Sequence, residues 1–317
     1  MHNPLMTTPP LRIVFFGTAG FAVPSLEAVA ALPHQIVGVV TAPDAWRRKI
    51  PFATPVRRWA QTHGIPSITP PTPRDPQLLE WLRQHPADLF LVIAYKKLPR
   101  AVWAMPPKGT VNLHASLLPD YRGAAPIHHA LIRSETETGV TTFYIDDAID
   151  TGDIIFQQAV SIDPEDTFGT LHDRLARAGA DLVVRTLSAI AEGTAPRIRQ
   201  TMRSSKKAPR LTREFTRIQW DQPAERLYHF IRGLSPVPGA WTTFGGRRVK
   251  VLFARPQPAA EPLLPGHFKI DRQTLLVGTA VPDRPLRLER LQLEGKRAMT
   301  AEEVVRGRLL PPSGQFN

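Results

Sequence analysis

The chain has 317 residues, 42% of them hydrophobic, and no cysteine. This length favours two domains over one, and the lack of cysteine excludes disulfides and thiolate zinc sites. The formal charge of +12 is unevenly divided, because residues 1–200 carry 19 Lys and Arg against 18 Asp and Glu, whereas residues 201–317 carry 21 against 10. A positive excess confined to the last third indicates a polyanionic partner, either nucleic acid or a membrane surface, rather than a basic domain without one.

The beginning of the chain is not expected to act as a secretory signal. The stretch "MHNPLMTTPP" lacks the basic and apolar regions of a secretory signal, so residues 1–10 are expected to form a disordered tail. No stretch approaches the roughly 18 continuous apolar residues of a membrane span. We therefore expect a cytoplasmic protein that binds no membrane.

The first half of the chain alternates apolar runs with segments of helical spacing. Expected strands are residues 11–17, 35–42, 89–95 and 109–115, and expected helices are residues 23–32, 54–63, 76–85 and 167–192. Residues 139–146 and 153–162 are close enough in sequence for a hairpin-like pair. The alternation predicts an α/β fold with a Rossmann-like, doubly wound and mostly parallel sheet.

The composition changes near residue 201. The stretch "RSSKKAPRLTREFTRIQW" is basic and polar, and a short helix over residues 223–232 and several short strands with frequent turns follow it. This pattern is typical of a small antiparallel barrel. We expect a catalytic domain over 11–203, a linker over 204–216 and a second domain over 217–317.

Polar residues end one of the expected buried strands. Asn112 and His114 flank Leu113 in "GTVNLHA", so both side chains point to one face of the strand. An amide donor and an imidazole suit stabilisation of a developing oxyanion and transfer of a proton. Two satisfied polar groups at a strand end would look the same, and on two residues alone that reading is preferred.

An acidic turn downstream changes this balance. Asp150 lies in "DDAIDTGD", and a carboxylate there would orient His114 and accept a proton. The alternative to a catalytic role for Asp150 is that this stretch is simply a solvated acidic turn. His128 and His129 do not indicate a metal, because adjacent residues of a helix point in different directions.

The glycines after the first strand do not define a nucleotide site. The stretch "GTAGFAVPSL" over residues 17–26 is neither a complete dinucleotide fingerprint nor a Walker motif. Because strand ends collect ligands in such sheets, we interpret it as a loop that lines the site rather than as an ordinary turn.

Several stretches together resemble the folate-dependent formyltransferases along nearly the whole chain. The core is "NLHASLLPDYRGAAP" with "DTGD" downstream, and "FFGTAGFAVPSL" and "ETGVTTFYIDDAIDTGDII" extend it. The stretches "KKAPRLTREFTRIQW" and "FIRGLSPVPGAW" narrow the resemblance to the members that act on initiator methionyl-tRNA.

The resemblance implies a donor, an acceptor and a set of residues. The donor would be 10-formyltetrahydrofolate, the acceptor the α-amino group of initiator methionyl-tRNA, with no metal, and the second domain would be an OB-like barrel that holds the tRNA. We expect a monomer. The catalytic residues would be Asn112, His114 and Asp150. The expected folate contacts are Ser116, Leu117, Leu118, Pro119, Lys97 and Leu98. The expected tRNA contacts are Arg47, Arg48, Lys49, Lys206, Lys207, Arg247, Arg248 and Lys250.

The chain departs from the family pattern in two places. The loop over residues 43–58 lacks the glycine that many relatives have, although it keeps five basic residues and adds Trp46. Lys96 stands where the family usually has glycine, near the expected pterin pocket. These departures leave open how the loop meets the acceptor stem and what a lysine does beside the pterin.

Three other functions are compatible with parts of the sequence. A sugar-nucleotide formyltransferase would have the same catalytic trio, but its acceptor does not need so basic a second domain. A glycinamide ribonucleotide formyltransferase would leave residues 207–317 without a purpose. A non-catalytic tRNA-binding protein would not need Asn112, His114 and Asp150 together.

Overall fold

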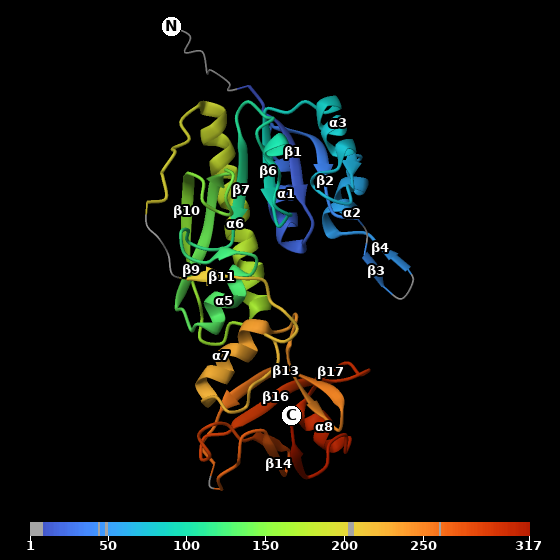
Figure 1. Cartoon of the computed structure of the whole chain (residues 1–317), viewed down its shortest axis with the longest axis vertical. Coiled ribbons are helices and arrows are strands. Elements are labelled where there is room, and N and C mark those ends of the chain that lie inside the picture. The colour runs from blue at the N-terminus through green and yellow to red at the C-terminus, as the bar shows by residue number, and fades with distance from the viewer. Residues whose placement is uncertain (1–8, 44, 48–49, 202–205, 260) are drawn as a thin grey trace. The chain divides into compact units, whose positions relative to one another are not determined.

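The computed structural model describes residues 9–43, 45–47, 50–201, 206–259 and 261–317 (Figure 1). The predicted tail therefore lies, up to residue 8, outside the described residues. The chain divides into two compact units. The first comprises residues 1–123, 137–161 and 172–207, and the second residues 124–136, 162–171 and 208–317.

The first unit is built on a seven-stranded sheet of mostly parallel strands. In spatial order the strands are β10 (Ile154–Ser161), β9 (Glu137–Tyr144), β7 (Thr110–His114), β6 (Leu89–Ile93), β1 (Arg12–Gly17), β2 (Gln35–Val40) and β5 (Ser67–Ile68). The strands from β7 to β5 are parallel, whereas β9 is antiparallel to both β7 and β10. The α/β fold with a parallel sheet and the hairpin-like pair are thus confirmed.

The four helices expected in this part of the chain are present as α1 (Val23–Ala30), α2 (Pro55–Thr62), α3 (Pro76–Gln84) and α6 (Phe168–Glu192). The short helices η1 (Gly20–Ala22) and α4 (Arg100–Trp103) were not predicted. Thr54 and Asp75 cap α2 and α3, since each side chain accepts a hydrogen bond from a first-turn backbone N–H. Gly193 follows α6 with a φ of 71°, the left-handed conformation in which many helices end.

The core beneath β1, β2 and β6 is apolar on both faces of the strands. Val14, Phe16, Phe90 and Val92 belong to one buried cluster, with Leu98 just beyond the end of β6. Burial on both faces explains the continuous apolar runs of these strands.

The second unit holds a separate antiparallel sheet. Its strands are β12 (Ala240–Phe244), β13 (Arg247–Pro256), β16 (Leu286–Leu293), β15 (Thr274–Val277), β14 (His267–Asp271) and β18 (Ser313–Gln315), with β17 (Ala298–Thr300) paired to β16. The helices are α5 (Pro126–Ile132), α7 (Ala224–Leu234) and α8 (Ala301–Arg306).

Short ladders join β3 (Ala45–Arg47) to β4 (Ile50–Phe52) and β8 (Arg122–Gly123) to β11 (Lys207–Ala208).

Helix α8 is absent from the sequence-based expectations, although a local signal marks it. Thr300 accepts a hydrogen bond from the Glu303 backbone N–H, and the Glu303 carboxylate accepts one from the Thr300 N–H. This capping box is a Thr followed three residues later by Glu, a pattern that predicts a helix start.

Candidate active site

The end of β7 directs two polar side chains away from the helix that covers the strand. A Cβ added to Gly179 of α6 would lie 2.6 Å from Leu113 Cδ2, so Leu113 packs tightly on that helix. Because side chains alternate along a strand, Asn112 and His114 point to the opposite face. Among the residues that the structure describes, the Asn112 carboxamide makes no hydrogen bond, which leaves its N–H donors available.

His114 is buried with one ring nitrogen already occupied. Its side chain is 8% exposed, and Nε2 donates to the Tyr121 carbonyl oxygen at 2.9 Å. Since a carbonyl only accepts, Nε2 carries a proton. The other nitrogen, Nδ1, lies 3.7 Å from Asp150 Oδ2. Nδ1 is therefore the ring atom left for chemistry, and it faces a carboxylate.

Asp150 is held in an unusual backbone conformation beside this ring. Its φ is 57°, in the left-handed region that L-residues rarely adopt. The Gly123 backbone N–H donates to Asp150 Oδ2 at 2.9 Å. Within the described part of the chain, Oδ1 has no hydrogen-bond partner. The carboxylate is thus anchored by one oxygen and free at the other.

A glutamine that the sequence reasoning missed holds the Asp150 turn. Gln200 Nε2 donates to the carbonyl oxygens of Asp150 at 3.1 Å and of Gly152 at 2.8 Å. Its Oε1 accepts from Arg122 Nη2 at 2.5 Å, and Arg122 immediately precedes Gly123. Both sides of the Asp150 contact are therefore tied to one carboxamide. A single glutamine in "PRIRQTM" gives no periodic signal that would have pointed to it.

Hydrogen bonds tether the loop after β7, and much of it faces inward. Thr141 Oγ1 donates to the Ser116 carbonyl oxygen at 2.6 Å and accepts from the Leu118 N–H at 3.1 Å. Gln157 Nε2 donates to the Leu118 carbonyl oxygen at 2.9 Å. The Leu118 side chain packs in a buried cluster with Phe143 and Ile154.

This packing limits which expected folate residues offer side chains to a ligand. Ser116 is fully buried, and its hydroxyl donates to the Asp120 carbonyl oxygen. Leu117, unlike Ser116, is only half-buried. Pro119 follows a cis peptide bond. Contact with a ligand through Ser116 and Leu118 would therefore involve the backbone more than the side chain.

The segment after β6 joins the same region. Lys97 Nζ donates to the Asp147 carbonyl oxygen at 2.7 Å, which ties this segment to the acidic turn. Lys97 and Leu98 also line a hollow of about 310 Å³ together with Arg74. Lys96 is exposed, and its Nζ lies 3.4 Å from the Pro71 carbonyl oxygen.

The expected tRNA residues have different surroundings. Arg48 and Lys49 lie outside the described residues, and only the backbone of Arg47, in β3, is described. Lys206 Nζ lies 3.8 Å from Asp120 Oδ2, and Lys207 is exposed in β11. The others are in β13: Arg247 and Arg248 are exposed, and Lys250 Nζ donates to the Pro238 carbonyl oxygen at 2.7 Å.

The two neighbouring histidines of α5 are structural. His128 Nδ1 donates to the Gly233 carbonyl oxygen, and His129 Nε2 donates to that of Pro209. In the described part of the chain no group of three or more His, Asp or Glu side chains is placed to hold a metal ion. No helix in the described residues is long and apolar enough to cross a membrane.

Two family models match the chain. The model described as formyl transferase covers residues 11–187, and the one described as formyl transferase, C-terminal domain, covers residues 210–309. The chain is 45% identical over 310 residues to the methionyl-tRNA formyltransferase of Chlorobium phaeovibrioides, covering 95% of this chain and 97% of that one. It is 41% identical over 309 residues to the methionyl-tRNA formyltransferase of Bacteroides fragilis, covering 94% and 95%.

Solved structures share the fold at lower identity. HypX from Aquifex aeolicus in complex with tetrahydrofolic acid superposes with a TM-score of 0.67 at 16% identity, over 94% of this chain and 47% of that one. The sugar 3N-formyl transferase WlaRD gives a TM-score of 0.64 at 19% identity, over 91% and 100%. The chain thus spans about half the length of HypX and all of WlaRD.

Proposed function

The chain belongs to the formyl transferase family, and we propose that it transfers the formyl group of 10-formyltetrahydrofolate to the α-amino group of methionyl-tRNA. The product would be formylmethionyl-tRNA for translation initiation. The observation that carries this proposal is the likeness to two methionyl-tRNA formyltransferases over nearly the full length of both chains. A reaction on charged tRNA would place the protein in the cytoplasm, where we expect it to act as a monomer.

The proposed chemistry follows from which atoms of the trio are free. The amine attacks the formyl carbon, a tetrahedral oxyanion forms, and the bond from that carbon to N10 of the folate then breaks. The Asn112 amide, which has no partner among the described residues, would donate to the oxyanion. Asp150 Oδ1, the unanchored oxygen, would accept the proton that the amine loses.

His114 would act through its remaining nitrogen. Because Nε2–H donates to the Tyr121 carbonyl oxygen, only Nδ1 is available for transferring a proton or donating to the oxyanion. The carboxylate of Asp150, 3.7 Å away, would stabilise a protonated ring. The leaving N10 must take up a proton, and the His114–Asp150 pair would donate it. No nucleophile of the enzyme is required.

The folate would lie against the loop after β7 and the segment after β6. The contacts we propose are Ser116, Leu117, Leu118, Pro119, Lys97 and Leu98. The backbone tethers from Thr141 and Gln157 support a preformed wall. The hollow beside Lys97 adds positive charge from Arg74, which would suit the carboxylates of the glutamyl end.

The second domain, which we place over residues 217–317 with an OB-like barrel, would supply most of the attraction for tRNA. Basic residues at 201–317 exceed acidic ones by 21 to 10. Such charges neutralise phosphates and position the nucleic acid without reading its sequence. The contacts proposed are Arg47, Arg48, Lys49, Lys206, Lys207, Arg247, Arg248 and Lys250.

A second candidate function is N-formylation of an amino sugar carried on a nucleotide. WlaRD is a sugar 3N-formyl transferase with a similar fold, but an identity of 19% supports the fold alone. The basic second domain favours tRNA, since a nucleotide sugar presents only two phosphates. The tRNA reaction is therefore the function that we propose.

An acceptor competition tests the proposal directly. The purified chain is incubated with 10-formyltetrahydrofolate and either methionyl-tRNA or an amino-sugar nucleotide, and formylated product is quantified. We expect turnover with methionyl-tRNA alone, and no turnover with the His114→Ala variant as control. Turnover of the sugar nucleotide without turnover of methionyl-tRNA would refute the proposal.

A further inference from the structure

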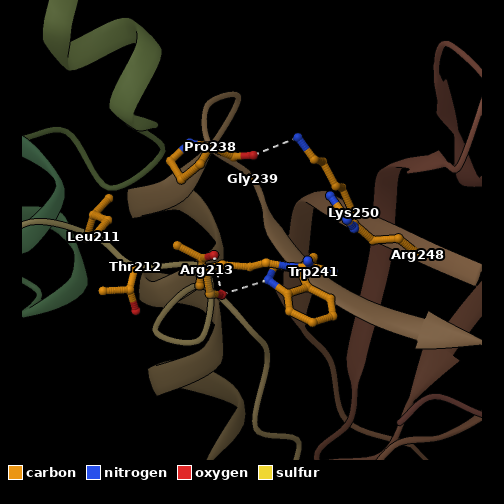
Figure 2. A pocket seen from close by; sticks show the side chains of 9 residues that line it. Leu211, Thr212, Arg213, Pro238, Gly239, Trp241, Arg248 and Lys250 are labelled. Carbon is orange, nitrogen blue, oxygen red and sulfur yellow. Dashed lines mark hydrogen bonds between the residues drawn. The ribbon is translucent and has the colours of Figure 1, made fainter.

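A small hollow in the second unit combines one tryptophan with several cations (Figure 2). Its volume is about 280 Å³, and it lies between the segment before α7 and the hairpin of β12 and β13. Its lining residues are Leu211, Thr212, Arg213, Thr216, Pro238, Gly239, Trp241, Arg248 and Lys250. We call this set the Trp241 pocket.

The indole of Trp241 is locked in place by its surroundings. Its backbone pairs with the segment before α7, because Trp241 N donates to the Thr216 carbonyl oxygen and the Trp241 carbonyl oxygen accepts from Ile218 N. Its ring Nε1 donates to the Arg213 carbonyl oxygen at 3.0 Å. The indole has no other polar atom, so it offers a ligand a rigid apolar surface rather than a hydrogen bond.

Three guanidinium groups surround this ring. Those of Arg213, Arg217 and Arg248 lie 5.4, 5.7 and 5.7 Å from the ring centroid. No carboxylate of the described residues lies within 4.0 Å of any of the three. Each cation–π contact offsets part of their mutual repulsion. A cluster of like charges around one fixed ring is most stable with an anion between them.

The charged side chains that line the pocket, Arg213, Arg248 and Lys250, carry only donors. A guanidinium has N–H donors and no acceptor, and the Lys250 ammonium uses only one of its three N–H groups on Pro238. The acid next to Arg213 in sequence, Glu214, accepts from its own backbone N–H and from the Thr212 hydroxyl, which lower its pKa most, and Arg213 contributes least. The pocket therefore fits an oxyanion with several acceptor oxygens.

We propose that the Trp241 pocket binds a phosphodiester group of the tRNA backbone. The inference rests on the proposed function, because it takes the polyanion of the second domain to be tRNA. A phosphodiester matches the forked donors of the arginines that line the pocket, and contacts to phosphate position a nucleic acid without reading its sequence. It adds Arg213, Arg217 and Trp241 to the residues of the nucleic-acid surface.

Binding of an initiator tRNA transcript to the full chain tests this pocket. Replacing Arg213→Gln and Arg248→Gln together removes two of the three guanidinium groups. We expect the Kd to rise at least tenfold, and the slope of log K against log salt to flatten by about 1–2, since roughly 0.9 counterion is released per phosphate contact. Trp241→Phe removes the bond to Arg213 and should raise the Kd in the same direction.

The matched control removes the same charge outside the pocket. Arg287 and Arg290 are exposed on β16 and do not line the hollow, so Arg287→Gln with Arg290→Gln should change the Kd less than about threefold. Equal losses in the two double variants would show only a general charge effect and would overturn the proposal. So would binding of AMP to the wild type as tightly as the transcript, since the pocket would then be a mononucleotide site. A wild type that neither binds nor formylates tRNA would instead refute the proposed function.

Discussion

The carboxamide of Gln200 should control catalysis through Asp150, although it lies outside the proposed trio. Gln200→Met keeps the shape of the side chain but removes the hydrogen bonds to the carbonyl oxygens of Asp150 and Gly152 and the acceptor for Arg122. The backbone of Asp150, at a φ of 57°, is costly for a residue other than glycine. Without its tethers, the turn is expected to relax and withdraw the carboxylate from His114.

The size of the effect follows from the two lost tethers. At about 1 kcal/mol net for each hydrogen bond, the productive turn loses about 2 kcal/mol, which corresponds to a roughly 30-fold fall in kcat. The KM for the folate should stay within about twofold, because the loop over residues 116–119 is held by Thr141 and Gln157 instead. Steady-state kinetics with methionyl-tRNA measure both values, at a temperature where the variant is folded.

A double-mutant cycle separates positioning from general damage. If Gln200 acts through Asp150, Gln200→Met should cost less than about threefold in a chain that already carries Asp150→Asn. Gln158→Met, at an exposed position of β10, makes the same chemical change away from the turn and should leave kcat unaltered. An equal loss of kcat in the wild-type and Asp150→Asn backgrounds would refute the reasoning.

Three further outcomes are expected. His114→Ala should lower kcat by roughly 10²–10⁴-fold with the fold intact by circular dichroism, and a loss below tenfold would remove it from the chemistry. Gly152→Ala should lower both kcat and the melting temperature, because its Cβ would lie 1.7 Å from the Tyr144 carbonyl oxygen; unchanged values would contradict that crowding. Burial is the largest cause that lowers the pKa of His129 below 6.5, the value in an unfolded chain. The neutral ring therefore contributes to stability above pH 6.5, and this contribution is lost as the pH falls through the pKa of the folded state. Melting temperatures from pH 5 to 8 should therefore depend less on pH in His129→Gln than in the wild type.

Local patterns in the sequence predict most of the secondary structure of the first unit. The continuous apolar runs of β1, β2 and β6 identify buried parallel strands, because period and flanking residues are local properties. The alternation in "VNLHA" likewise determines that Asn112 and His114 share a face, whichever sheet the strand joins. The distribution of charge is likewise a property of the sequence, and the positive excess after residue 200 already indicates a polyanionic partner.

Only the tertiary structure shows which groups contact these residues. Gln200 and Arg122 are 78 positions apart in sequence, and no periodicity or propensity predicts a hydrogen bond over such a distance. The loop after β7 shows the same limit: its "SLLP" indicates an apolar wall, but only the packing of Leu118 on Phe143 and Ile154 reveals that this side chain faces the core. The Trp241 pocket likewise exists only because the segment before α7 pairs with β12 and carries two arginines to a ring that the sequence places 24 or more residues away. Sequence specifies which groups are present and how each element faces, whereas long-range packing determines which of them share a site.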